Sequence, residues 1–198
     1  MPANANSPDS AEFARARLGT RARTLRKQAG LTLKELSQRS GVALSTLSKM
    51  ELGQTTVGYE KLAAVAKALK LDIGKFFSSD DAVASGGPGQ GQSDAIAAAS
   101  FNSDTYEFQM LATDFANKHM TPVGTVVYAR ERSQFKDFIR HEGQEFVVVL
   151  VGSVRIEFET GQTINLKRHQ SAYFDSGVGH VYLSTSKLPA RLVVVMAD

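Results

Sequence analysis

Four residues share one face of a helix predicted over residues 44–52, and their side chains indicate the function of the chain more clearly than any others. At positions i, i+3, i+4 and i+7 of this face stand Ser45, Ser48, Lys49 and Leu52. The two hydroxyl groups can donate or accept a hydrogen bond, whereas the ammonium group of Lys49 can only donate. A short, polar and basic face of this kind is typical of a helix that lies in a groove of DNA.

The residues just before this face predict how the helix is positioned. Thr32 and Glu35 fit the capping box, in which a hydroxyl and a carboxylate satisfy each other's backbone donors at a helix start. Gly41 supplies the backbone freedom for a sharp turn, so two short helices are expected on either side of it. The apolar residues expected to face inward in this unit are Leu36, Val42, Leu47 and Met50.

Charge is divided unevenly along the chain. Residues 11–77 hold 13 Lys and Arg against 5 Asp and Glu, a net charge of +8. Residues 101–198 hold 10 Lys and Arg against 11 Asp and Glu, a net charge of −1. A basic excess confined to one part of the chain is the electrostatic footprint expected for phosphate contacts. It argues against the alternative of a five-helix bundle that binds protein or has no binding partner.

The segment TLKELSQRSGVALSTLSKMELG, residues 32–53, resembles the helix-turn-helix of the Xre/Cro family of bacterial and phage regulators. The resemblance extends upstream through LGTRARTLRKQAGL and downstream through TVGYEKLAAVAKALKLDIGKFF. It implies a five-helix, lambda-repressor-like domain that binds DNA sequence-specifically. Ala43 departs from the family, which usually has a hydroxyl residue there to cap the recognition helix.

This resemblance implies roles for individual residues. Those expected to reach base edges are Leu44, Ser45, Ser48 and Lys49. Those expected to contact phosphates and set the register are Arg23, Lys27, Lys34 and Thr46. Arg26 and Glu51 resemble a pair that joins the first and third helices in this family, so a structural salt bridge is expected between them.

Composition divides the chain into two domains. Residues 1–10 are polar and are expected to form a disordered tail before a DNA-binding domain at residues 11–77. Residues 78–100 hold four glycines, one proline and no aromatic residue, which predicts a flexible linker to a second domain at residues 101–198. The second domain is expected to be all-β, with strands in the seven β-branched or aromatic runs 106–111, 123–129, 145–151, 154–159, 171–174, 180–183 and 190–196.

Two segments of this second domain resemble the signature motifs of the cupin superfamily. HEGQEFVVVLVG, residues 141–152, resembles the first motif, and YFDSGVGHVYLS, residues 173–184, resembles the second. The resemblance implies the cupin fold, a double-stranded β-helix or jelly roll. It carries the family's pocket and motif residues onto His141, Glu145, Gly152, Gly177 and His180.

His141, Glu145 and His180 then form a candidate two-His-one-carboxylate set for one divalent ion such as Fe, Zn, Mn or Ni. Metal-binding cupins usually carry another His two residues before His141, where this chain has Ile139. Because four residues of straight strand span about 13 Å, the first two side chains reach one ion only if the chain turns at Gly143. Two alternatives stay open, a metal site and a metal-free polar effector pocket, and the missing ligand favours the second.

Further residues lie on or next to strands predicted near His141, Glu145 and His180. They are Tyr128, Arg130, Arg140, Tyr173 and Tyr182. The sequence does not show which of them face the pocket of the cupin domain and which face outward or pack against other residues. His169 stands where the family generally has Gly and is expected on a surface turn.

A helix-turn-helix followed by a cupin domain is an arrangement known for many bacterial regulators. It implies a one-component transcription regulator, without catalytic residues, that binds an operator and senses a small-molecule effector. The alternative is a non-haem Fe(II) enzyme similar to hydroxypropylphosphonate epoxidase, which joins the same kinds of domain and holds a His-x3-Glu set with a distant His. The basic recognition helix favours the regulator.

The regulator interpretation implies a homodimer, because paired recognition helices about 34 Å apart read a palindrome. The cupin domain offers more apolar surface for the dimer interface. No apolar run approaches the roughly 20 residues of a membrane-spanning helix, and no apolar signal segment is present. With no cysteine there is also no disulfide framework. A cytoplasmic, nucleoid-associated bacterial protein is therefore expected.

Overall fold

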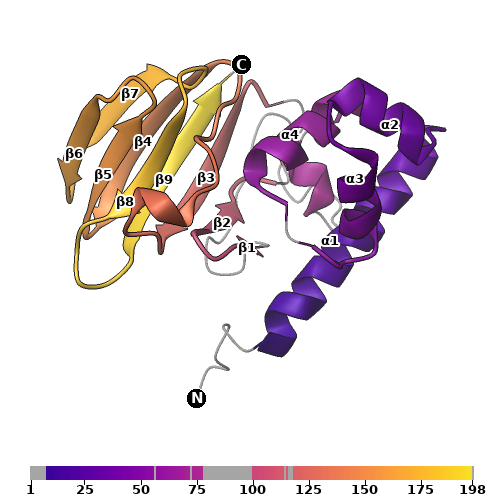
Figure 1. Ribbon diagram of the computed structural model, residues 1–198, viewed down its shortest axis with the longest axis horizontal. Helices are drawn as coiled ribbons and strands as arrows, with labels where there is room; N and C mark the ends of the chain where they lie inside the picture. Colours follow the sequence, from indigo (N-terminus) through magenta and orange to yellow (C-terminus); the bar gives the residue numbers. More distant parts are fainter. Residues whose placement is uncertain are drawn as a thin grey trace. The chain divides into compact units, whose positions relative to one another are not determined.

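The computed structural model describes residues 8–55, 57–71, 73–77, 100–113, 115 and 118–197. The chain divides into two compact units, Met1–Ala82 and Val83–Asp198, of which the first is helical and the second is built of strands (Figure 1). Of the predicted tail, residues 1–7 lie outside the described residues, and the first helix begins at Pro8. Of the predicted linker, only Ser100 is described, as the first residue of a strand.

The described residues of the first unit form four α-helices and one 3-10 helix. These are α1 (Pro8–Gln28), α2 (Leu33–Ser40), α3 (Leu44–Glu51), α4 (Tyr59–Ala68) and η1 (Ile73–Phe76). The predicted fifth α-helix is therefore wrong, because that segment makes only a short 3-10 helix. Lys70 adopts a left-handed backbone with φ 56°, which closes α4, and Gly74 is a poor helix former in the residues that follow.

The turn between α2 and α3 forms as the sequence predicts. The backbone N–H of Thr32 donates to Glu35 Oε2 at 2.8 Å, and the backbone N–H of Glu35 donates to Thr32 Oγ1 at 3.2 Å, which completes the capping box. Gly41 ends α2 in the left-handed region with φ 71°. The side chains expected to face inward, all of them buried, are Leu36, Val42, Leu47 and Met50.

The end of α3 lies directly against the backbone of α1. A Cβ placed on Gly19 would stand 2.4 Å from the carbonyl oxygen of Met50 and 2.9 Å from that of Glu51. Only glycine is accommodated at position 19, because the two nearest atoms belong to the backbone of α3. Backbone atoms, unlike the end of a flexible side chain, cannot move away from an added Cβ. Gly19 therefore sets how closely α3 packs on α1.

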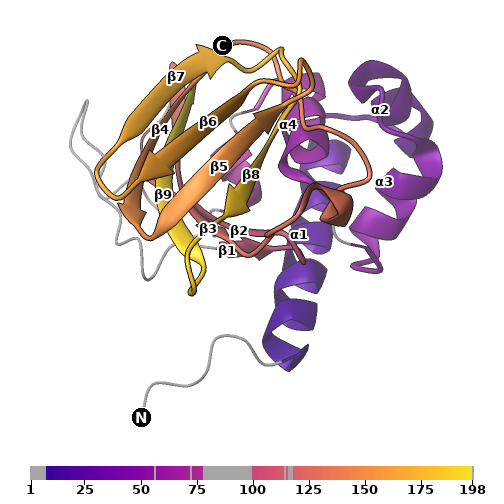
Figure 2. The same ribbon diagram turned by 60° about the vertical axis from the view of Figure 1, so that its left-hand side comes forward.

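The second unit is an antiparallel two-sheet structure. Its strands are β1 (Ser100–Asn102), β2 (Tyr106–Met110), β3 (Met120–Val127), β4 (Gln144–Val151), β5 (Ser153–Phe158), β6 (Thr163–Lys167), β7 (Ser171–Asp175), β8 (His180–Ser184) and β9 (Ala190–Ala197), with a 3-10 helix η2 (Arg132–Gln134). One sheet has the order β1-β2-β3-β9-β4-β7 and the other β6-β5-β8. Figure 2 shows the smaller sheet in front of the larger one.

The core lies between the two sheets. Val147 pairs with Val194, and Val194 with Val123, so three buried side chains form one row across the larger sheet. Ile156 and Tyr182 make the corresponding buried pair on the smaller sheet. The all-β expectation for this domain is therefore confirmed, although the sequence did not predict β1 and β6.

Strand β8 is buried on both of its faces. Val181 and Leu183 pack with Ala129, and Phe135 and Phe138 cover this cluster. Because side chains alternate along a strand, the neighbouring residues of β8 point to the opposite side, between the sheets. This double packing fixes β8 in place.

Within the described part of the chain, no helix is long and apolar enough to cross a membrane.

Candidate functional site

Helix α3 presents the predicted face outward from its own unit. Leu44 is 47% exposed and Leu52 is 58% exposed, and Ser45 and Lys49 are exposed as well. Ser48 is half-buried. The two faces of this short helix are thus distinct, because Leu47 and Met50 fill the core behind it.

A buried ion pair joins α1 to α3. Nε of Arg26 donates to Glu51 Oε1 at 2.6 Å, and Nη2 donates to Oε2 at 2.8 Å. Nη1 of Arg26 also donates to the carbonyl oxygen of Leu31 at 2.7 Å. Both charged residues are only 8% exposed, and the hydrogen bonds to Glu51 raise the pKa of Arg26. The pair therefore holds the C-terminal turn of α3 to α1 with matched charges.

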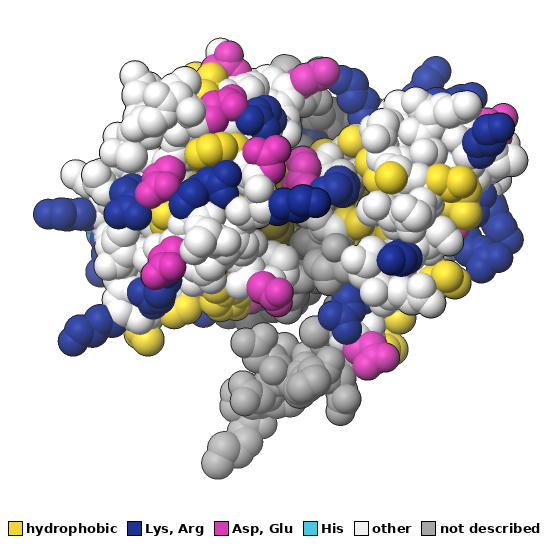
Figure 3. All heavy atoms as spheres, in the orientation of Figure 1, with side chains coloured by type: hydrophobic (Ala, Val, Ile, Leu, Met, Phe, Trp, Pro, Cys, Tyr) yellow, Lys and Arg dark blue, Asp and Glu magenta, His cyan; other side chains and the backbone are white. Residues whose placement is uncertain are grey.

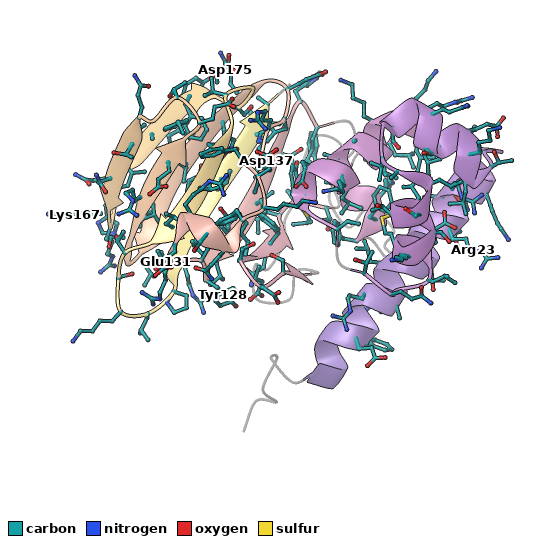
Figure 4. The ribbon with its side chains drawn as sticks, viewed as in Figure 1. Arg23, Tyr128, Glu131, Asp137, Lys167 and Asp175 are labelled. Carbon is teal, nitrogen blue, oxygen red and sulfur yellow. The ribbon has the colours of Figure 1, made fainter. Side chains whose placement is uncertain are left out.

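The residues expected to contact phosphates lie on the surface of the helical domain. Arg23, Lys27 and Lys34 are exposed, and Thr46 is half-buried. Arg23 lies among the side chains that project from this domain in Figure 4. Figure 3 shows dark blue Lys and Arg side chains along the right-hand margin of the same domain. Ala43 makes no side-chain hydrogen bond at the start of α3, as its lack of a polar group dictates.

In the second unit, His141, Glu145 and His180 come together. Each offers one ligand atom, and these atoms lie within 4.8 Å of one another. His141 Nε2 is 2.8 Å from Glu145 Oε2, and His180 Nε2 is 3.5 Å from the same oxygen. Gly143 adopts φ 91°, in the left-handed region, between the first two residues. The turn that the sequence required for convergence is therefore present.

Backbone carbonyl groups orient both imidazole rings. His180 Nδ1 lies 2.9 Å from the carbonyl oxygen of Val178, and His141 Nδ1 lies 3.3 Å from that of Glu142. A carbonyl oxygen only accepts, so each Nδ1 can donate to it, and each Nε2 then faces Glu145, either as a donor that carries a proton or with a lone pair that can bind a metal ion. Two lone pairs facing a carboxylate oxygen need a cation between them, either added protons or a metal ion. This donor set fits one divalent ion.

Glu145 is ionised within this cluster. It is 2% exposed, and burial alone would raise its pKa. Hydrogen bonds from His141, His180 and Tyr182 outweigh burial and lower the pKa to about 2. The hydroxyl of Tyr182 donates to Glu145 Oε1, and burial raises the pKa of this phenol well above its ordinary value. Tyr182 therefore stays protonated and remains a hydrogen-bond donor.

Aromatic rings enclose the third ligand. The ring of His180 lies 4.9 Å from that of Phe174 and 6.4 Å from that of Phe158, measured between centroids. Phe174 pairs with Glu145 in the larger sheet, and Phe158 pairs with His180 in the smaller one. Sequence reasoning missed both residues, because only the strand register, which has no local signal, reveals that they flank the cluster.

The structure sorts the five strand residues that the sequence left unassigned. Tyr182 alone among them contacts the cluster. The hydrogen-bond partners of the other four lie elsewhere: Tyr128 with Glu107, Arg130 with Ser186 and Lys187, Arg140 with Glu159, and Tyr173 with Gln144.

The two departures from the cupin pattern also have defined places. Ile139 forms a backbone bridge with His180, with N–H to O distances of 3.1 and 3.0 Å, so the position of the missing ligand lies directly beside the cluster. His169 lies on an exposed turn with φ 69°, as expected for a residue where the family has Gly.

Comparison with known proteins agrees with both halves of this description. The helix-turn-helix family matches residues 23–76, and the cupin domain family matches residues 125–196. None of the curated proteins has a matching sequence.

Among solved structures, an HTH_3 family transcriptional regulator from Vibrio cholerae is similar, with a TM-score of 0.64 and 19% identity over 95% of this chain and 98% of that one. Hydroxypropylphosphonic acid epoxidase from S. wedmorenis matches with a TM-score of 0.49 and 19% identity over 93% of this chain and 99% of that one. At 19% identity, the similarity to the Vibrio cholerae regulator is a similarity of fold alone. Residues 23–76 therefore match a helix-turn-helix domain and residues 125–196 match a cupin domain, the two kinds of domain that the motifs in the sequence indicated.

Proposed function

We propose that this protein is a sequence-specific DNA-binding transcription regulator whose cupin domain binds a small-molecule effector. The observation that carries the proposal is the outward face of α3 on a domain of net charge +8. Such a face supplies base contacts, and the surrounding charge supplies attraction to phosphates. A regulator of this kind works in the cytoplasm, on the bacterial nucleoid.

We assign the base contacts to the first residue of α3 and to its outward face. Lys49 donates to guanine, Ser45 and Ser48 bond to either kind of base edge, and Leu44 contacts a thymine methyl group. The phosphate contacts are assigned to Arg23, Lys27, Lys34 and Thr46. The Arg26–Glu51 pair takes no part in binding and holds α3 in position.

Selection from a pool of random duplexes tests this function without knowledge of the operator. The full-length protein is incubated with the pool at about 0.15 M salt, where non-specific binding is weakened. We expect enrichment of a palindrome whose half-sites are about one helical turn, 34 Å, apart. A pool that stays random after repeated selection would contradict the proposal.

The dimer that a palindrome requires is assigned to the outer face of the larger sheet. Phe146 is exposed there and pairs with Tyr173 on one side and Val195 on the other, and Leu150 is exposed farther along β4. Scattered apolar side chains are normal on a surface, but a row across three paired strands marks an interface. A second copy of the chain fits this face, because one patch used twice gives the two-fold symmetry of a palindrome.

Light scattering after size exclusion tests the interface. We expect a dimer for the unaltered chain and a monomer for Phe146→Glu. Leu188→Glu is the matched control, since Leu188 is an exposed apolar residue outside the named strands, and this variant should remain dimeric. A monomeric unaltered chain, or a dimeric Phe146→Glu variant, would contradict the assignment.

A second candidate function rests on the cluster of His141, Glu145 and His180. Two histidines and one carboxylate within 4.8 Å suit a non-haem iron enzyme as well as an effector site. In such an enzyme the bound iron would supply dioxygen chemistry, and the three residues would hold it. Oxygen consumption that requires both Fe(II) and an added substrate, together with a random pool after selection, would support the enzyme.

A further inference from the structure

The two carboxylate oxygens of Glu145 have different partners. Oε2 faces both imidazole rings, at 2.8 Å from His141 Nε2 and 3.5 Å from His180 Nε2. Oε1 instead accepts a hydrogen bond from the hydroxyl of Tyr182. One oxygen therefore belongs to the ligand cluster, and the other is occupied by a protein donor.

Tyr182 is itself held firmly by the larger sheet. It lies on β8, at the edge of the smaller sheet, where none of the described strands other than β5 pairs with its backbone. Tyr106, from β2, takes the place of a second partner strand: its hydroxyl accepts from the N–H of Tyr182 at 2.7 Å and donates to its carbonyl oxygen at 3.1 Å. Both tyrosines are buried, so this contact links the two sheets next to the cluster.

A carboxylate can bind a metal ion through one oxygen or through both. Binding through both would require Glu145 Oε1 to leave the hydroxyl of Tyr182. That hydroxyl is buried and would lose its acceptor, which is unfavourable for a group removed from water. The arrangement therefore opposes binding through both oxygens.

We infer that Tyr182 is a positioning residue that restricts Glu145 to one metal-binding oxygen, Oε2, and thereby keeps one more coordination position free for the effector. The identity of the ligand in the free position rests on the proposed effector binding. The restriction of Glu145 to one oxygen does not, because it follows from the contacts of Glu145 with Tyr182, His141 and His180.

Cobalt(II) is a suitable probe, because its visible absorption reports the number and arrangement of ligands. The test compares the unaltered chain with Tyr182→Phe and with Tyr128→Phe. The second variant is a matched control, since Tyr128 donates to Glu107 Oε2 at 2.8 Å in the same domain but away from the cluster. Affinity is measured by competition with a chelating dye, and the ligands are counted by X-ray absorption.

We expect Tyr182→Phe to show a second bound carboxylate oxygen by X-ray absorption and an altered spectrum, because Oε1 is then free. The affinity for cobalt should change about 10- to 100-fold, as is usual when a residue supporting a ligand is removed. Tyr128→Phe should match the unaltered chain in all of these respects. Equal affinity and spectrum in Tyr182→Phe would overturn the inference.

Two further outcomes decide the matter without that variant. If Tyr182→Phe fails to fold, X-ray absorption of the unaltered chain still distinguishes one bound carboxylate oxygen, as expected, from two, which would overturn the inference. Absence of cobalt binding to the unaltered chain would overturn it as well. No measurement here uses DNA, so the outcome is independent of whether the protein regulates transcription.

Discussion

Arg26 and Glu51 form a bidentate ion pair in which each carboxylate oxygen accepts a hydrogen bond from a different guanidinium nitrogen, at 2.6 and 2.8 Å. The pair is buried and bridges α1 and α3, so the helix that carries the candidate base contacts is held by matched charges as well as by apolar packing. The orientation of α3 therefore depends on residues that do not themselves face outward.

Removal of one partner of this pair should destabilise the helical domain. Glu51→Gln leaves the Arg26 charge buried without its counter-charge, and we expect a loss of about 3 kcal/mol in the free energy of unfolding, measured by urea titration. Glu60→Gln is the control, because Glu60 pairs with Lys61 at the surface, where such a pair contributes about 1 kcal/mol or less. Equal losses in the two variants would contradict a structural role for Arg26 and Glu51.

Gly19 should tolerate no side chain. Gly19→Ala places a Cβ 2.4 Å from the carbonyl oxygen of Met50, so α3 must move away from α1. We expect a loss of about 1 to 3 kcal/mol in the free energy of unfolding, the usual cost of overpacking, and weaker DNA binding. Thr20→Ala, at the exposed neighbouring position, should leave both nearly unchanged. An unaltered Tm in Gly19→Ala would argue that the two helices are less closely packed.

The acid stability of the metal-free cupin domain should depend on Glu145. Its pKa is about 2 in the folded chain, against an ordinary value of 4.5, so the folded state favours the ionised form. The stabilisation, about 3 kcal/mol for such a shift, is complete above pH 4.5 and is lost as the pH falls toward 2.

Urea titration followed by tyrosine fluorescence measures this dependence against Glu145→Gln. The unaltered chain should be more stable above pH 4.5, and the difference should shrink steadily toward pH 2. A difference that does not change with pH would show that Glu145 is not ionised in the folded protein.

A divalent ion should stabilise the cupin domain. Added Mn(II) or Co(II) at 100 times its dissociation constant should contribute about 2.7 kcal/mol to the free energy of unfolding, and a chelator should remove this gain. His180→Ala should abolish the effect, whereas His169→Ala should retain it, because His169 is exposed on a turn outside the cluster. The metal-free effector pocket would be favoured if no ion raised the Tm of the unaltered chain.

Local signals in the sequence predicted much of the fold. The capping box of Thr32 and Glu35 and the turn at Gly41 are short-range features, and the structure contains both. The turn at Gly143 followed from the reach of two ligands and is also present. Local patterns succeed where the residues that determine a structure are neighbours in the chain.

Features that depend on distant residues could not be predicted in this way. Gly19 resembles any helical glycine until the backbone of α3 is placed against it. Phe174 and Tyr182 join the cluster through strand register and the packing of two sheets. The fifth helix was predicted from resemblance, but this chain has Gly74 there and only a 3-10 helix forms. Strand β6 was missed although Ile164 and Leu166 alternate with polar residues in it, which is a local signal of a strand.

The central claim is that the outward face of α3 reads base pairs, and Lys49 tests it most directly. The selected operator and a random duplex are titrated with the unaltered chain, with Lys49→Ala, and with Lys34→Ala, which removes a proposed phosphate contact. We predict that Lys49→Ala lowers the ratio of operator to random affinity about 5- to 150-fold, whereas Lys34→Ala weakens binding to both duplexes alike. An unchanged ratio in Lys49→Ala, or an unaltered chain that does not distinguish the two duplexes, would contradict the account.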